Sequence, residues 1–325
     1  MRSGRLARRR HDPGGDATAG GREARLSEQE AGLEPGLAES PVNGDLPVER
    51  AGRAFLWSLQ SRADRSLAGR LAFELLMFGL KQAWACVFGG VLLLLILLSH
   101  LFWPAHAPLA RYDGLVAAAL ALQVVMLAAR LESLREAAAI LLFHLAGTGM
   151  ELFKTSVHSW TYPEPSLIRL AGVPLFSGFM YASVGSYIAR SWRILHLRFE
   201  DYPPFWITWA LGAAVYANFF ADHYGWDFRW LLFGGAALVY RRTAVVFRPD
   251  RRERRMPLLL GFGLIALFIW LAENLATSCH AWLYPAQRHG WRLVAPEKLG
   301  SWLLLAILSF VLVTLVQRPT RAARA

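Results

Sequence analysis

The chain has few cysteines and long stretches without charge, and both absences limit what it can be. Only two cysteines, Cys86 and Cys279, occur in 325 residues, so the sequence predicts neither a structural disulfide nor a cysteine-based metal site. It contains no nucleotide-binding glycine loop, nucleophile elbow or zinc-protease motif, which argues against ATP-driven transport and peptide hydrolysis. Residues 299–317 carry no charge at all, which a helix with one face in water would not tolerate.

What the chain does have is apolar sequence, in runs long enough to cross a bilayer. Hydrophobic residues make up 55% of it. We therefore predict an all-α fold, a polytopic membrane helix bundle with about eight transmembrane helices at 83–102, 113–130, 135–153, 172–193, 204–221, 228–246, 257–277 and 299–317. Residues 68–82, with Glu74 and Lys81 among leucines, are predicted to form an amphipathic helix at the membrane surface. No cofactor is expected.

The two ends of the chain differ in kind from this predicted transmembrane domain, 83–319. The first 70 residues hold twelve Arg and ten acidic residues, with no aromatic before Phe55, so residues 1–67 are predicted to be a disordered tail. Residues 320–325 form a short basic tail. Arg8 to Arg10 also fit a twin-arginine export signal or an anionic-lipid patch, although no apolar stretch follows them.

Basic residues alternate between the predicted loops, which predicts an orientation. One side receives the N-terminal tail and most of the arginines, namely Arg130, Arg135, Arg190, Arg193, Arg198, Arg241, Arg242, Arg248, Arg251, Arg252, Arg254, Arg255, Arg318, Arg321 and Arg324. The positive-inside rule then places both termini in the cytoplasm, and we expect the chain in the cell's inner (plasma) membrane. A bilayer partner explains the net charge of +11 better than nucleic acid does.

A thirteen-residue segment occurs twice, at 151–163 and 273–285. Glu, Thr, Ser, His, Trp, Tyr and Pro recur at seven identical positions. The copies lie four predicted spans apart, so the third and seventh spans run in the same direction. This predicts two parallel four-helix halves, about 83–195 and 203–317, related by an axis along the membrane normal. Glu151 and Glu273 would then lie at equal depth near the outer surface.

An ionisable residue inside a membrane segment is a functional candidate. We predict Glu151 and Glu273 as catalytic residues and, as substrate-binding residues, His144, His158, Trp160, Tyr162, Asn274, His280, Trp282 and Tyr284. No metal is expected, because lone histidines at a membrane surface are more often hydrogen-bonding groups than ligands. Alternatively, each glutamate hydrogen-bonds the turn after its helix and the aromatics form an interfacial belt. A belt alone does not require the fixed Glu-to-Trp and Glu-to-Tyr spacing.

Several runs resemble a known family. Residues 78–85, the first repeat, residues 172–187 and residues 268–274 are similar to the bacterial membrane proteins called domain of unknown function 817, over about residues 73–319. This resemblance implies the membrane architecture and no activity. More distantly, Glu273-Asn274 with its Trp-x-Tyr, and residues 160–175, resemble the membrane lycopene cyclases. Those enzymes carry two glutamates where this chain has Phe176 and Ser177, so cyclase activity is not implied.

Three functions fit the paired segments. The leading hypothesis is a membrane-embedded enzyme or binding protein for an apolar, isoprenoid-like lipid, because a protonated carboxylic acid can donate to an alkene and aromatic faces stabilise the resulting cation. The second is a proton-coupled small-molecule transporter. The third is a structural or assembly protein in which the repeat supports folding. The oligomeric state stays open.

Overall fold

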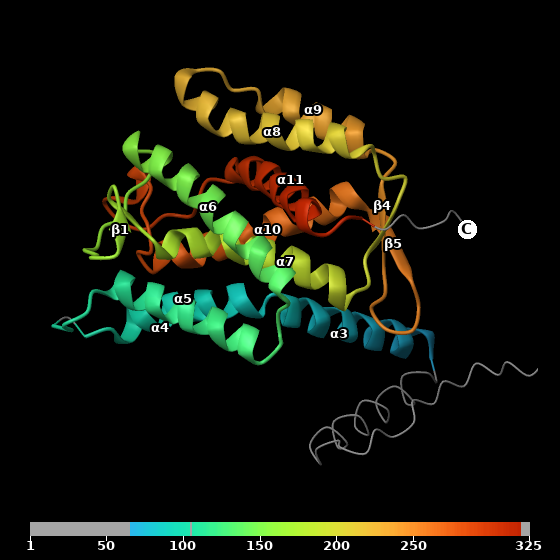
Figure 1. Ribbon diagram of the computed structural model, residues 1–325, viewed down its shortest axis with the longest axis horizontal. Helices are drawn as coiled ribbons and strands as arrows, with labels where there is room; N and C mark the ends of the chain where they lie inside the picture. Colours follow the sequence, from blue (N-terminus) through green and yellow to red (C-terminus); the bar gives the residue numbers. More distant parts are fainter. Residues whose placement is uncertain (1–65, 105, 320–325) are drawn as a thin grey trace, which may run out of the picture. The chain divides into compact units, whose positions relative to one another are not determined.

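The computed structural model describes residues 66–104 and 106–319 (Figure 1). The predicted tails at 1–67 and 320–325, and with them Arg8 to Arg10, lie outside these residues, except for Ser66 and Leu67. Within the described part the chain is mostly helical, as predicted.

A bend interrupts the first predicted span. The structure has α3 (Leu67–Ala85) and α4 (Val87–Phe102), which meet at an angle of 68°. Ser66 begins α3 by accepting a hydrogen bond from the Gly69 N–H. The bend lies within a few residues of the boundary predicted between a surface helix and a span, at residues 82 and 83. Cys86, which lies within the span predicted at 83–102, is the residue at the bend.

Seven further α-helices follow in the described part of the chain, most with bounds close to those predicted. They are α5 (Arg111–Ala128), α6 (Leu134–Ser156), α7 (Phe176–Ile194), α8 (Phe205–Ala221), α9 (Arg229–Tyr240), α10 (Leu258–Ser278) and α11 (Lys298–Val316). A capping box formed by Ser133 and Glu136 starts α6. Two 3-10 turns, η1 (Asp222–Tyr224) and η2 (Pro285–Gln287), lie in loops.

Several of these helices have the length and composition of membrane spans. Among the described residues four qualify, α5, α6 from Glu136, α10 and α11, and the bent pair α3 and α4 would supply a fifth. The helices α8 and α9 have 17 and 12 residues and are shorter, while α7 carries Arg190 and Arg193. By length and composition, four or five helices of the described part could therefore cross a membrane.

Short strands correct the all-α prediction. In one sheet β3 (Arg198–Glu200), β4 (Ala244–Phe247) and β5 (Arg254–Pro257) pair antiparallel in that order, and β1 (Arg169–Leu170) pairs with β2 (Val173–Pro174) in another. The span predicted at 228–246 is wrong at its end, because the helix stops at Tyr240 and β-branched residues continue as β4. The span predicted from 172 starts at Phe176, because Gly172 has φ +87° in the turn between β1 and β2.

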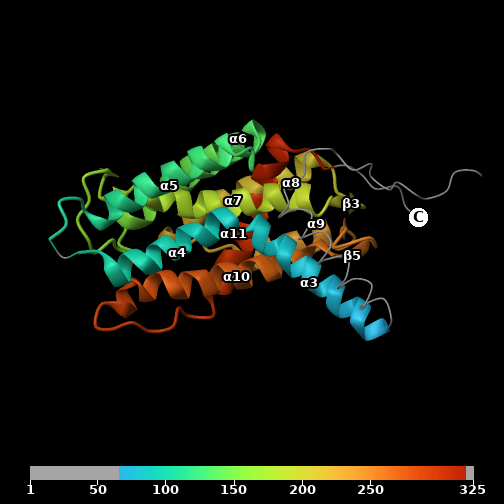
Figure 2. The same ribbon diagram turned by 90° about the horizontal axis from the view of Figure 1, so that it is seen from below.

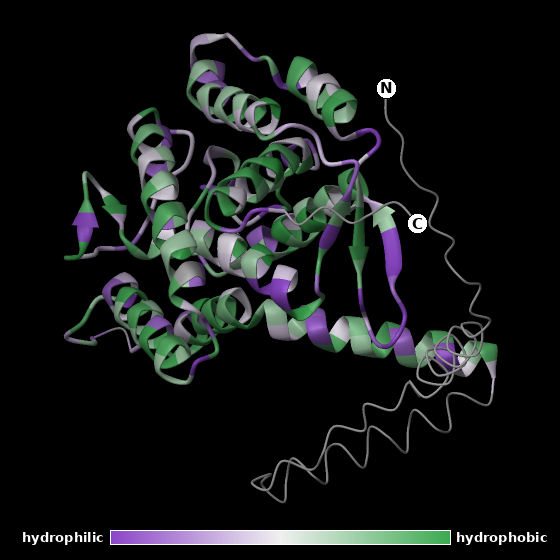
Figure 3. Cartoon of the chain, turned by 45° about the vertical axis from the view of Figure 1, so that its right-hand side comes forward, coloured by the Kyte–Doolittle hydropathy of each residue, from purple (hydrophilic) through white to green (hydrophobic). Residues whose placement is uncertain are grey.

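The hairpin of β4 and β5 is rich in charged residues, most of them arginines. Figure 3 shows hydrophilic residues on β5 beside largely hydrophobic helices. Glu74 of α3 forms an ion pair with Arg254, and Lys81 donates to the Arg248 carbonyl at 3.0 Å. The helix predicted to lie on the membrane surface is thus attached to this hairpin.

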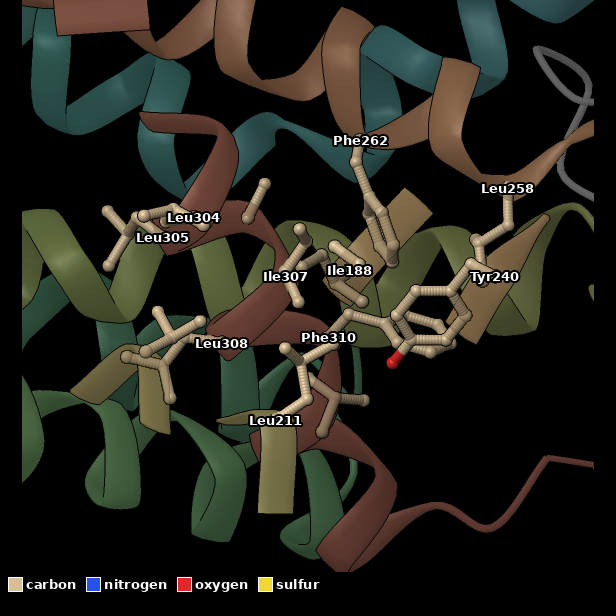
Figure 4. Close-up of a cluster of buried hydrophobic side chains, with 14 of the residues drawn as sticks. Ile188, Leu211, Tyr240, Leu258, Phe262, Leu304, Leu305, Ile307, Leu308 and Phe310 are labelled. Carbon is tan, nitrogen blue, oxygen red and sulfur yellow. The ribbon is translucent and has the colours of Figure 1, made fainter. Parts of the chain in front are cut away.

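The core lies between α7, α10 and α11 (Figures 1 and 2). Ile188, Phe262, Ile307 and Phe310 are all at most 4% exposed and converge there (Figure 4). Helix α6 packs along α7, and α10 packs along α11. Glycine permits the first contact, since a Cβ added at Gly185 would lie 2.4 Å from the Phe143 ring.

Candidate functional site

The two repeated segments end their helices in the same way. After α6, the His158 N–H bonds the Thr155 carbonyl and the next N–H bonds the Lys154 carbonyl. After α10, His280 and the residue that follows it repeat this pattern. The two histidines have φ +57° and +54°, the left-handed position of a Schellman motif. Both side chains are exposed, so the structure places these predicted binding residues on the surface.

The segments that follow the two turns run toward each other. Thr161 and Leu283, which occupy equivalent positions in the two copies, exchange backbone hydrogen bonds of 3.0 and 2.9 Å. Beside this bridge the rings of Trp160 and Tyr284 meet edge to face, with centroids 6.0 Å apart. The two copies, far apart in sequence, therefore meet at matching residues.

Glu151 accepts three hydrogen bonds. Trp160 Nε1 and the Tyr162 hydroxyl donate to Oε2 at 2.8 and 2.6 Å, and the Tyr181 hydroxyl of α7 donates to Oε1 at 2.8 Å. The residue is only 3% exposed. Two of the donors come from the repeated segment itself, and the third was not among the predicted site residues.

Glu273 has a similar but not identical set of partners. Tyr284 donates to Oε1, and Trp302 Nε1 of α11 donates to Oε2 at 2.7 Å. The indole donor here is Trp302 and not Trp282, which the sequence repeat suggested. Tyr181 and Trp302 each lie in the helix after their repeat, 30 and 29 residues beyond the glutamate. Their one sequence signal is this nearly equal separation of 30 and 29 residues, which can be recognised only once the partners are known.

The donors around the two oxygens of each carboxyl group differ in kind. An indole N–H only donates, so Oε2 of both glutamates acts as an acceptor, whereas a tyrosine hydroxyl facing Oε1 can donate or accept. Burial and the adjacent glutamates raise the pKa values of Tyr162 and Tyr284 well above the ordinary value, so both stay hydroxyls. Within the described residues neither glutamate forms an ion pair with Lys, Arg or His.

Two other predicted residues, Asn274 and His144, make different contacts and do not line the cavity described below. Asn274 accepts from the Val294 N–H and donates to the Trp270 carbonyl, both at 2.8 Å, so it fastens the loop after η2 onto α10. His144 packs its ring against Phe179, with centroids 4.6 Å apart. Both side chains thus contact other parts of the protein, a loop in one case and a neighbouring helix in the other.

The glutamates line one end of a large cavity of about 1060 Å³, above the usual size of a small-molecule site. Residues of α10 line it from Leu258 to Ala276, which is about 27 Å along a helix axis. Most of the lining is apolar, and charge is concentrated at the glutamate end. There Lys298 holds its ammonium 4.6 Å from the centroid of the Tyr284 ring. Among the described residues no group of three His, Cys, Asp or Glu side chains could hold a metal ion.

Comparison with known proteins gives a family and a relative. A family model described as "Protein of unknown function (DUF817)" matches residues 74–310. The chain is 41% identical over 254 residues to the "Uncharacterized protein YoaT" of Bacillus subtilis (strain 168), covering 77% of this chain and 96% of that protein. No solved structure matches the chain.

Proposed function

From the premise that this chain belongs to the DUF817 family of proteins of unknown function, we propose that it binds an elongated apolar lipid in the membrane and presents it to Glu151 and Glu273. The observation that carries this proposal is that both glutamates are buried, have no ion pair among the described residues, and lie at the charged end of a cavity lined mostly by apolar residues.

The proposed architecture is an eight-span bundle in two parallel halves, α4 to α7 and α8 to α11, with α3 as an addition to the first half. It is supported by the equivalent Schellman turns and by the bridge between Thr161 and Leu283, in which matching positions pair with each other. The arginines of the β4–β5 hairpin support an inner-membrane location with both termini in the cytoplasm. The glutamates would then lie near the outer surface.

The ligand class follows from the cavity. The lining of α10 is apolar from Leu258 to Ala272, about 21 Å along the helix axis. It favours an acyl or isoprenoid chain, because it offers few hydrogen-bonding partners to a polar one. The glutamate end offers carboxyl groups, hydroxyls and aromatic rings to the polar or unsaturated end of such a chain. The reaction that suits this end is proton transfer from a carboxylic acid to the ligand, with the aromatic faces stabilising positive charge.

The two carboxyl groups differ in how many further hydrogen bonds they can accept. Glu151 already accepts three hydrogen bonds and Glu273 accepts two, while a carboxylate can accept about four. Glu273 therefore has more capacity for a ligand. We assign the main ligand contact to Glu273 and a supporting role to Glu151.

The test compares Glu273→Gln and Glu151→Gln with a control, Glu297→Gln, whose exposed carboxyl group also lines the cavity. Each variant is extracted from the membrane with its surrounding lipid, and the lipids retained after purification are measured by mass spectrometry. We expect the wild type and the control to retain the same enriched apolar lipid. Glu273→Gln should change its amount or chemical form more than Glu151→Gln does. Identical lipids in all four proteins would contradict the proposal.

One observation also favours a proton-coupled carrier, namely that the cavity follows α10 for almost its whole length. A carrier would move protons together with its substrate, so proteoliposomes with an internal pH dye distinguish the two functions. A lipid-binding enzyme gives no ligand-dependent proton flux in this assay.

A further inference from the structure

The wall of the cavity is incomplete on one side. Four of its lining residues, Cys86, Gly90, Leu264 and Phe268, are also exposed on the surface, Phe268 by 69%. A residue that both lines a cavity and is exposed lies at the rim of an opening. These four come from the α3–α4 bend and from α10, which lie near each other in Figure 2. We call this rim the side opening.

The side opening is surrounded by apolar surface. Helix α4 contains no Asp, Glu, Lys or Arg, and the one such residue of α10 is the buried Glu273. Leu94 on α4 and Leu271 on α10 are each 50% exposed next to it. In a span of a membrane protein such a surface faces hydrocarbon, because lipid chains tolerate exposed leucines that water would not.

Local sequence explains why the opening exists. The 68° bend at Cys86 turns α3 away from the line of α4. Glycine also leaves space in the cavity wall on this side. A Cβ added at Gly79 or Gly90, which both line the cavity, would meet nothing within 4 Å.

Building on the proposed function, we propose that the ligand enters sideways from the bilayer through the side opening, and that it is a membrane lipid with a single acyl or isoprenoid chain. Its chain lies along α10, and its polar end meets Glu151 and Glu273. The apolar rim admits a chain that is already dissolved in the membrane. The exposed lining residues at the glutamate end, Ala295 and Glu297, lie beside Lys298, and this charged rim suits an apolar chain less well than the side opening does.

The test narrows the opening with Gly90→Leu. The matched control is Gly263→Leu on α10, because Gly263 is also exposed with nothing within 4 Å of an added Cβ, but it does not line the cavity. Both changes replace helical glycine by a better helix former, so both variants should fold. The probe is palmitic acid with a diazirine in mid-chain, added to each protein in phosphatidylcholine nanodiscs and photolysed, and crosslinked α10 peptides are quantified by mass spectrometry.

We expect crosslinks on the cavity face of α10 in the wild type and in Gly263→Leu, and about tenfold fewer in Gly90→Leu, as overpacking of about 1.4 kcal/mol would give. Cys86 provides a second readout, because Cys279 is buried and the two are the cysteines of the chain. Uncharged N-ethylmaleimide should label Cys86, the palmitate probe should slow this labelling, and a charged methanethiosulfonate reagent should leave Cys86 unlabelled.

The outcomes separate the two proposals. Crosslinks that are equally strong in Gly90→Leu, or rapid labelling of Cys86 by the charged reagent, would overturn entry from the bilayer and leave the bound lipid in place. An absence of cavity crosslinks in the wild type, together with no enriched lipid in the purified protein, would overturn the proposed function as well.

Discussion

Replacing Glu151 by leucine should destabilise the protein, whereas replacing it by glutamine should not. Leucine removes the acceptor of Trp160, Tyr162 and Tyr181 and leaves three buried donors without a partner. A glutamine amide can replace the carboxylate, since its oxygen can accept from Trp160 and Tyr162 while its N–H donates to the Tyr181 hydroxyl. The pair of variants thus separates the hydrogen bonds from the acid.

The number of donors sets the magnitude. Side-chain hydrogen bonds between membrane helices contribute about 0.6 kcal/mol on average and up to about 1.7. Three lost bonds should therefore lower the free energy of unfolding by about 2 to 5 kcal/mol in Glu151→Leu. Glu273→Leu loses two bonds, from Tyr284 and Trp302, and should cost about 1 to 3 kcal/mol. Glu151→Gln should stay within about 1 kcal/mol of the wild type.

Unfolding by SDS in mixed micelles, followed by circular dichroism, measures these differences. The expected order of stability is the wild type and Glu151→Gln together, then Glu273→Leu, then Glu151→Leu. If glutamine were as harmful as leucine, the negative charge and not the acceptor would hold the loops. Equal losses for the two leucine variants would contradict the assignment of three partners to one glutamate and two to the other.

Three further substitutions test other contacts of the site. Trp302→Phe should lower the free energy of unfolding by about 0.6 to 1.7 kcal/mol in the same titration, and more than Trp282→Phe, because Trp302 is the residue that donates to Glu273. Gly178→Ala should cost about 1 to 3 kcal/mol, measured as a lower midpoint of thermal unfolding, since its Cβ would lie 2.4 Å from His144 Nδ1. Asn274→Ala should speed proteolysis of the loop at 286–297, because the Val294 N–H loses its acceptor; an unchanged cleavage rate would show that other contacts hold this loop.

Local sequence carried the information for the helix ends and for part of the site. The nine- and eleven-residue spacings from Glu151 to Trp160 and Tyr162 are those of a chain that leaves a helix through a left-handed turn and folds back over its last turn. Such a path depends on a few consecutive residues, and its repetition in the second copy made it visible. Tyr181 and Trp302 depend on how the following helices pack, which no local pattern encodes.

Packing also explains where the sequence misled. Arg190 counts as a loop charge in the orientation argument, but it lies in α7 with 0% exposure and donates to the carbonyls of Leu131 and Trp84 at 2.9 Å. A hydropathy scale counts the charge of Arg190, but it contains no information on the two backbone carbonyls that accept its hydrogen bonds. The strand β4 was missed for a related reason, because a short β-branched run continuing from an apolar helix has no periodicity of its own.

The differences between the two copies support the proposed assignment of the main ligand contact to Glu273. Both copies keep the helix end, the left-handed histidine and the bond from tyrosine to glutamate, which are the contacts that hold the loops together. They differ in the indole donor, which comes from the loop in the first copy and from the next helix in the second. That exchange leaves Trp282 free of Glu273, and both line the cavity next to Lys298. A duplicated unit needs only one copy to anchor the loops, so we expect the second copy, with its spare acceptor capacity, to make the main contact with the proposed ligand and Glu151 to support it.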